Sequence, residues 1–289
     1  MRIKKAVIAV AGYGTRFLPQ TKASPKEMLP IIDKPVIHYV VEEAISCGVT
    51  DVVIVTSWQK RTVEDYFDFT PELEQYLREN GKENLIELID EPAKLANFIY
   101  IRQKGPYGNA IPVKNAKSVL GDDPFIVLYG DEFMEAKPLT RPQQLAETFE
   151  KYNAPVISCI ETTEPNDGGR YAFVEGELVE DNIIRVRRIV EKPGIGKAQS
   201  NHASVAGYLL TKDIFPILDN QKPGVGGEYY LPEAINELAQ ITPVYARKLN
   251  FDRWHDAGNK LEYSKTVVEL ALRDPDIGKA LKEHILKII

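Results

Sequence analysis

The segment KKAVIAVAGYGTRFLPQTKASPKEMLP, residues 4–30, decides the fold. Its apolar run Ala6–Val10 has the length of a buried strand and leads directly into a loop that contains Gly12 and Gly14. The basic start and short apolar run resemble a signal peptide only superficially, because Gly and Arg follow at once without a small-residue cleavage pattern. The segment therefore predicts a first buried strand followed by a ligand-binding loop.

The glycines of this loop remove Cβ atoms from the backbone where a ligand has to approach. Exposed amides between Ala11 and Thr15 can then hold phosphate oxygens or the edge of a base, while Arg16 and Lys26 supply positive charge. The glycine spacing fits neither the dinucleotide fingerprint nor the Walker loop, since no Gly-Lys-Ser/Thr follows. A Gly-x-Gly after a strand is weak evidence by itself, because tight turns share it.

Strand-length apolar runs recur through the first half of the chain, separated by longer segments with helical spacing. This alternation predicts an α/β fold with a parallel sheet whose carboxyl edge binds ligands. The expected helices are Val36–Cys47 and Asn109–Leu120. The expected strands are Ala6–Val10, Val52–Thr56, Phe98–Ile101, Phe125–Tyr129 and Val156–Ile160.

After Ile160 the apolar runs are shorter and have polar flanks, which predicts a mixed or antiparallel continuation of the sheet. No low-complexity linker interrupts residues 1–289, so we expect a single domain that ends in helices from about 258 to 289, with a break at Asp274-Pro275. The expected strands are Tyr171–Val174, Leu178–Glu180, Ile183–Val190 and Ser204–Leu210.

The composition excludes several classes of protein. The 289 residues are 44% hydrophobic and 27% charged, as in globular proteins, and the net charge of −6 argues against a nucleic-acid partner. No apolar stretch approaches the roughly 18 residues of a membrane span. With two cysteines there is no disulfide framework, so we expect a cytoplasmic protein without a membrane partner.

Several motifs, taken together, are far more specific than the first loop alone. The string AGYGTRFLP continues into KASPKEMLP and DKP, and related motifs follow in order along nearly the whole chain. They are IRQK at 101–104, GD at 130–131, VEKP at 190–193, GE at 227–228 and DAGNKL at 256–261. This set resembles the bacterial UTP:glucose-1-phosphate uridylyltransferases of the sugar nucleotidyltransferase family.

The resemblance implies a Rossmann-like (GT-A-like) α/β nucleotidyltransferase fold with a mixed central sheet and a small added β region. It also implies Mg²⁺-assisted in-line attack of glucose 1-phosphate on the α-phosphorus of UTP, which gives UDP-glucose and pyrophosphate. Because two anions must meet, neutralisation and positioning should dominate catalysis. We also expect the enzyme to be a homo-oligomer.

By resemblance, the catalytic residues are Arg16, Lys26, Asp131, Lys192 and Asp256, and Mg²⁺ is held by Asp131 and Asp256. The nucleotide-binding set adds main-chain and side-chain groups around the base and the phosphates. It comprises Ala11, Gly12, Gly14, Thr15, Arg16, Lys26, Gln103 and Gly108, with the Gln103 amide reading the uracil edge. The sugar-phosphate set comprises Ala172, Glu191, Lys192 and Glu228.

The chain departs from the usual family pattern at three positions near the expected site. Asn109 stands where relatives usually have histidine, Glu132 where they have a second aspartate, and Ala172 where a glycine commonly approaches the sugar. A thymidylyltransferase for glucose 1-phosphate, another sugar-1-phosphate nucleotidyltransferase and a non-catalytic sugar-nucleotide sensor are therefore the alternative functions. The intact Asp131 and Asp256 argue against the sensor, because a silent binder has no need of a reaction centre.

Overall fold

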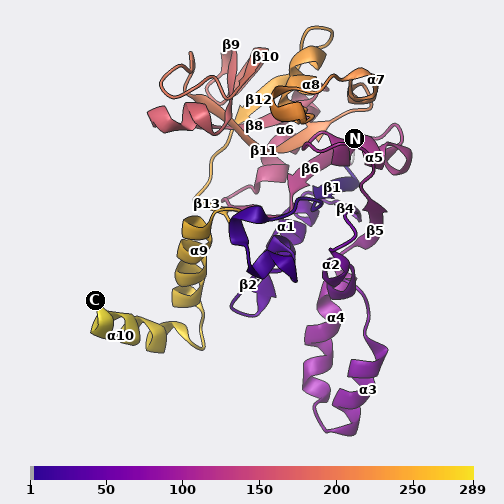
Figure 1. Ribbon diagram of the computed structural model, residues 1–289, viewed down its shortest axis with the longest axis vertical. Coiled ribbons are helices and arrows are strands. Elements are labelled where there is room, and N and C mark those ends of the chain that lie inside the picture. Colours follow the sequence, from indigo (N-terminus) through magenta and orange to yellow (C-terminus); the bar gives the residue numbers. More distant parts are fainter. Residues whose placement is uncertain (1–2) are drawn as a thin grey trace.

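A nine-stranded mixed sheet forms the centre of the computed structural model, which describes residues 3–289 (Figure 1). Its strand order is β5-β4-β1-β6-β11-β8-β12-β10-β9. The first four of these strands are parallel to one another, as the alternating sequence pattern predicts. They are β1 (Lys5–Ala9), β4 (Asp51–Thr56), β5 (Asn97–Arg102) and β6 (Phe125–Tyr129).

Alternate side chains of the parallel strands point into two separate apolar cores, one on each face of the sheet. In β1, Val7 belongs to the core under α5 (Ile111–Leu120), whereas Ile8 belongs to the core under α1 (Val36–Ile45). The helix expected over Asn109–Leu120 thus begins two residues later, at Ile111. Asn109 is outside the helix because its side-chain oxygen accepts the Leu231 amide at 2.6 Å.

In the second half of the sheet, β11 pairs with β6 and β8 in antiparallel register, β10 pairs with β9 and β12 in antiparallel register, and β12 is parallel to β8. This confirms the predicted mixed or antiparallel continuation of the sheet. One expectation there is wrong: Tyr171–Val174 and Leu178–Glu180 are not two strands, because a single strand, β9, runs from Ala172 through both segments. Gly176 lies in the middle of β9, where a Cβ atom would come within 2.1 Å of the Arg185 carbonyl oxygen. The strands are β8 (Val156–Glu161), β9 (Ala172–Glu180), β10 (Ile183–Glu191), β11 (His202–Leu210) and β12 (Tyr245–Lys248).

A separate two-stranded ladder crosses between the sheet and the C-terminal helices. It pairs β7 (Glu132–Glu135) with β13 (Arg253–Asp256) in antiparallel register, so that Asp256 lies opposite Glu132. Three more helices, α6 (Arg141–Tyr152), α7 (Ile214–Asn220) and α8 (Leu231–Leu238), cover the second half of the sheet (Figure 1). Another short ladder joins β2 (Pro30–Ile31) to β3 (Lys34–Pro35).

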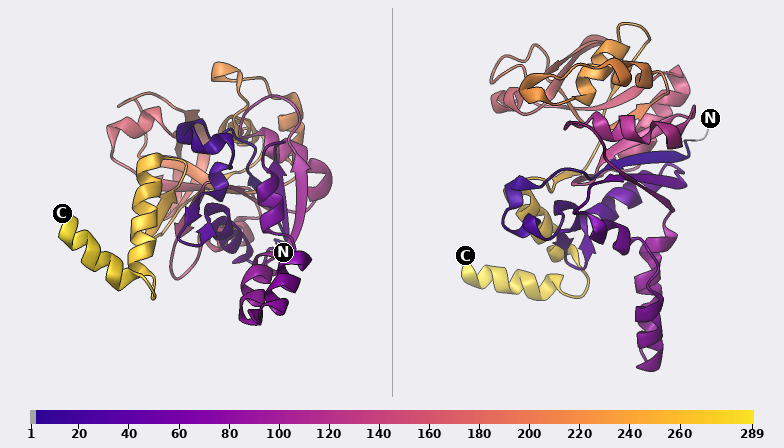
Figure 2. Two further views of the ribbon diagram at one scale, coloured as in Figure 1. Left: turned by 60° about the horizontal axis from the view of Figure 1, so that its bottom comes forward. Right: turned by 45° about the vertical axis from the view of Figure 1, so that its right-hand side comes forward.

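Two helical elements project from the body in different directions (Figure 2). One is the hairpin of α3 (Pro71–Glu79) and α4 (Ile86–Lys94), which follows α2 (Arg61–Tyr66). The other is α10 (Gly278–Ile288), which packs against α9 (Lys260–Arg273) and leads away from the sheet. Among the described residues, no helix is long and apolar enough to cross a membrane.

Candidate active site

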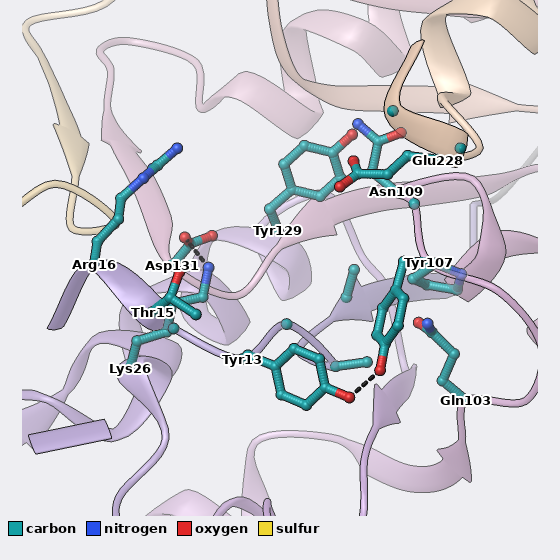
Figure 3. A pocket seen from close by; sticks show the side chains of 18 residues that line it. Tyr13, Thr15, Arg16, Lys26, Gln103, Tyr107, Asn109, Tyr129, Asp131 and Glu228 are labelled. Atoms are coloured by element: carbon teal, nitrogen blue, oxygen red, sulfur yellow. Dashed lines mark hydrogen bonds and ion pairs between the residues drawn. The ribbon is translucent and has the colours of Figure 1, made fainter. Parts of the chain in front are cut away.

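A cavity of about 690 Å³ opens at the carboxyl ends of β1, β5 and β6 (Figure 3). It is lined by all eight residues that the sequence assigns to nucleotide binding, and by Asp131. Figure 3 places Gln103 beside Tyr107 at one end, and Arg16, Lys26 and Asp131 at the other. The cavity thus has an amide end suited to a base edge and a cationic end suited to phosphate.

The first loop owes its shape to Gly14. Its φ of 65° lies in the left-handed region, and the short 3-10 turn Thr15–Phe17 begins immediately after it. The Thr21 hydroxyl donates a 2.7 Å hydrogen bond to the Gly14 carbonyl oxygen, which closes the loop on itself. This closure fixes Arg16, whose guanidinium donates to the Gly258 carbonyl oxygen at 3.4 Å.

The loop that carries Gln103 is tied to the loop before α8 by backbone contacts. At Gly108, φ is 136° and a Cβ atom would lie 2.1 Å from the Tyr229 carbonyl oxygen, so only glycine fits. Ala110 N donates to that oxygen at 3.1 Å, and Asn109 caps the first amide of α8. Asn109, which replaces the usual histidine, therefore holds the loop in place from the border of the cavity.

Asp131 and Asp256 come together although 125 positions separate them in the chain. The β7–β13 ladder brings them to the same end, where a Cβ atom on Gly258 would be 2.5 Å from Asp131 Oδ2 and 3.2 Å from Asp256 Oδ1. Burial and then the charge of Asp131 raise the pKa of Asp256. The two carboxylates both approach Gly258, so one cation could contact both of them.

Lys26 is the cation that Asp131 holds in this structure, through a direct ion pair (Figure 3). Burial opposes the charge of both groups, but their attraction outweighs it: the pKa of Asp131 is lowered and that of Lys26 is raised. Glu27, the next residue, is fully buried and pairs with Lys60 at 2.5 Å. Two ion pairs thus involve the neighbouring residues Lys26 and Glu27.

Glu132, which replaces the usual second aspartate, forms a buried ion pair with Arg141 and also lines a second cavity beside the first. Its carboxylate accepts a 2.8 Å hydrogen bond from Arg141 Nη1, and Arg141 also binds Glu43 through Nε at 2.7 Å and Nη2 at 2.8 Å. Arg141 is fully buried, and burial raises the pKa of Glu132 to about 7 against the opposing charge of Arg141. Glu132 therefore ties β7 to α6 through Arg141.

A second cavity of about 160 Å³ shares Asn109 and Tyr129 with the first. Ala172 and Glu191, two of the residues assigned to the sugar phosphate, line it. Trp254 lines it as well, and its buried indole Nε1 has no hydrogen-bond partner among residues 3–289. The Glu191 carboxylate offers this cavity an acceptor for a ligand that carries hydroxyl groups.

The other two sugar-phosphate residues lie elsewhere. Glu228 lines the first cavity, while the exposed Lys192 ammonium lies 5.4 Å from the centre of the Tyr230 ring. Lys192 has a left-handed backbone, with a φ of 41°, and its amide donates to the Tyr171 carbonyl oxygen at 3.2 Å. Such strain in a non-glycine residue is typical of functional positions.

The motifs do not reveal the contacts that three further residues of the site make. Tyr13 and Tyr107 hydrogen-bond to each other across the first cavity, and Arg170 lies 3.9 Å from Asp256 Oδ2. Tyr13 lies inside the AGYGTRFLP motif, but its pairing with a residue 94 positions away could not be inferred from spacing. An arginine followed by a tyrosine is also compatible with many surface positions, so the sequence does not single out Arg170.

Comparison with known proteins agrees with this geometry. The sequence pattern of the family described as Nucleotidyl transferase matches residues 5–271. A UTP--glucose-1-phosphate uridylyltransferase from Staphylococcus epidermidis is 42% identical over 287 residues, which cover 99% of each chain. A UTP-bound UGPase from Acinetobacter baumannii is 33% identical, with a TM-score of 0.90 over 99% of this chain and 100% of that one.

A crystal structure of a UDP-glucose pyrophosphorylase complexed with UDP-glucose is also similar, at 33% identity and a TM-score of 0.83 over 94% of this chain and 100% of that one. The fold and the site therefore define a nucleotidyltransferase, and the chain belongs to the Nucleotidyl transferase family. Within it, the predicted resemblance to the bacterial UTP:glucose-1-phosphate uridylyltransferases is confirmed.

Proposed function

We propose that the chain transfers the uridylyl group of UTP to glucose 1-phosphate and releases UDP-glucose and pyrophosphate. The observation that carries this proposal is the joined pair of cavities: one has an amide at one end and Arg16 and Lys26 at the other, and the second holds Glu191. The relatives support it, since one is named for this reaction and two of the solved structures are described with UTP or UDP-glucose bound.

The reaction needs positive charge more than it needs a base. A phosphate oxygen of glucose 1-phosphate forms a bond to the α-phosphorus, and the bond to the bridging oxygen of pyrophosphate breaks. The attacking oxygen is already ionised at neutral pH, so no proton has to be removed. Arg16 and Lys26 neutralise the triphosphate, and the closed glycine loop orients its oxygens without reorganisation.

Asp131 and Asp256 fit a magnesium ion. Mg²⁺ prefers oxygen ligands and keeps several waters, so two carboxylates that converge on Gly258 are a sufficient protein contribution. When bound, the ion supplies charge neutralisation to the two reacting phosphates. Glu132 is not part of the proposed ligand set, because its carboxylate pairs with Arg141.

The test of this function is pyrophosphate release across UTP, dTTP, CTP, ATP and GTP with several sugar 1-phosphates. We expect UTP with glucose 1-phosphate to give the highest kcat/KM. A higher value with dTTP would identify a thymidylyltransferase instead, and a preferred sugar other than glucose would identify another member of the family. Tight UDP-glucose binding without turnover for any pair would identify a sensor.

Gln103→Ala should lower kcat/KM for UTP by about 5- to 150-fold, because about 1 to 3 kcal/mol is lost when a polar base edge is left unpaired. Steady-state pyrophosphate release measures this, with ATP as the comparison nucleotide. Gln199→Ala, an exposed amide outside both cavities, is the matched control and should be neutral. An equal loss for UTP and ATP would argue against base recognition by Gln103.

Lys192→Ala should raise KM for glucose 1-phosphate by about tenfold or more, since a charge-assisted contact to the sugar phosphate is removed. KM for UTP should change little, provided that sugar binding is near equilibrium. Lys197→Ala, an exposed lysine of the same loop, is the control. A large change for UTP alone would assign Lys192 to the nucleotide.

A further inference from the structure

A group of polar side chains joins α1 to the base of the projecting α3–α4 hairpin, outside both cavities of the candidate active site (Figure 2). His38 and Glu42 lie one turn apart on α1, and Glu91 lies near the end of α4. His38 Nε2 is 3.0 Å from Glu42 Oε1 and 3.9 Å from Glu91 Oε1. An imidazole and two carboxylates thus converge from two separate helices.

The surroundings of the fully buried His38 ring orient Nε2 toward the two carboxylates. The Tyr66 hydroxyl lies 3.0 Å from Nδ1, so it can accept Nδ1–H and leave a lone pair on Nε2. Nε2 faces the Lys34 ammonium, which can only donate, at 3.0 Å, and the Glu42 carboxylate, which when ionised can only accept, also at 3.0 Å. One ring nitrogen satisfies only one of these two groups at a time. A cation bound to the lone pair and to the carboxylates removes this conflict.

The Lys34 ammonium already places a positive charge among these three groups. Its Nζ atom lies 3.2 Å from Glu42 Oε1 and 4.0 Å from Glu91 Oε1. The Lys34 side chain is 33% exposed, so it can turn toward solvent when another cation takes its place. With a neutral imidazole, one ammonium leaves the two carboxylates one positive charge short, and a divalent cation supplies both charges.

We propose that His38, Glu42 and Glu91 bind Zn²⁺, or a similar divalent transition-metal cation, in place of the Lys34 ammonium. An imidazole with carboxylates suits such an ion, whereas Mg²⁺ prefers oxygen ligands alone. A tetrahedral ion with bonds of about 2.0–2.2 Å separates its ligand atoms by roughly 3.3–3.5 Å. The distances of 3.0 and 3.9 Å from Nε2 lie on either side of this range, so small side-chain shifts complete the geometry.

An adjoining cavity of about 240 Å³ gives the ion a path of entry and a source of water for the fourth ligand position. Glu91, Lys34 and Tyr66 line this cavity, together with the carboxylates of Asp33 and Asp65. Negative charge along the path favours a cation. The bound ion would tie α4 to α1 and so stabilise the base of the hairpin.

Calorimetric titration of the full-length chain with zinc chloride tests the site. Excess Mg²⁺ in the buffer keeps the oxygen ligands of Asp131 and Asp256 occupied. We expect the wild-type protein to bind one equivalent of Zn²⁺, and His38→Gln and Glu91→Gln to bind it at least about tenfold more weakly, because each variant lacks one ligand. Glu87→Gln, an exposed carboxylate of the same helix, is the matched control and should bind like the wild-type protein.

Lys34→Met separates a metal site from an ordinary ion-pair cluster. The variant removes the competing ammonium, so it should bind Zn²⁺ more tightly than the wild-type protein does. Zn²⁺ should also raise the midpoint of thermal unfolding of the wild-type protein and of Glu87→Gln, but not that of Glu91→Gln, because an ion that binds only the folded state stabilises it. Both measurements are independent of enzyme activity.

Circular dichroism establishes that each variant is folded, and the exposed position of Glu91 keeps the test informative if His38→Gln does not fold. Wild-type Zn²⁺ affinity in folded Glu91→Gln overturns the proposal, because the ion is then bound elsewhere. Unchanged or weaker binding by Lys34→Met overturns it as well. Binding by Lys34→Met alone would show that Lys34 excludes the metal, and that result also overturns the proposal.

Discussion

Replacing Asp131 or Asp256 by alanine should lower kcat at least about 10²-fold, because each change removes a carboxylate from the charge-neutralising centre of the reaction. Initial rates over a magnesium titration measure the effect. Asp131→Asn is a necessary companion, since Asp131→Ala leaves the buried Lys26 ammonium without its partner. Asp122→Ala, a change to an exposed carboxylate far from both cavities, should leave the rate unchanged.

The double variant distinguishes a shared ion from two independent roles. If both carboxylates hold one Mg²⁺, the combined loss should fall well short of the product of the single losses. Circular dichroism and urea unfolding establish that each variant is folded. A folded single variant with near-normal turnover at low magnesium would remove that residue from the metal site.

Arg141→Met should lower the free energy of unfolding by about 3–5 kcal/mol, measured by urea denaturation. Arg141 is the partner of two buried carboxylates, Glu43 and Glu132, and also donates to the Ala206 carbonyl oxygen at 2.7 Å. Methionine fills much of the space but removes the Arg141 donors from all three acceptors, and Glu43 keeps only the Met134 amide.

The matched control is Arg273→Met, which removes an arginine that also binds a carboxylate, Glu135, but at the surface. Exposed ion pairs contribute about 0 to 1 kcal/mol, so this variant should be close to the wild-type protein. A similar loss in both variants would mean that burial does not decide the importance of Arg141.

The sequence predicts the parallel half of the sheet well because β1, β4 and β6 are buried on both faces and appear as continuous apolar runs. It fails at β9, where Gly176 and its polar neighbours have the composition of a turn. β9 continues through this segment because of tertiary contacts. β10 pairs with β9 along its full length, and the close backbone contact at Gly176 forms only in the sheet.

The candidate site, too, could be predicted from the sequence only in part. Motifs place Gly14, Arg16 and Asp131 in one cavity, because each directly follows a strand whose carboxyl end lies at that edge. Motifs cannot show that Asn109 caps α8 or that Glu132 turns toward Arg141, since both depend on partners distant in sequence. The roles assigned to the site residues stay predictions until the variants are measured.

The β7–β13 ladder has a consequence for how the protein is made. Asp131 leaves the ribosome well before Asp256, and nothing holds the two together until β13 has been synthesised and has paired with β7. A nascent or prematurely terminated chain that stops before residue 253 can contain the complete glycine loop and Gln103, yet it has only one of the two carboxylates. We therefore expect chains that stop before β13 to lack the proposed Mg²⁺ site and its activity.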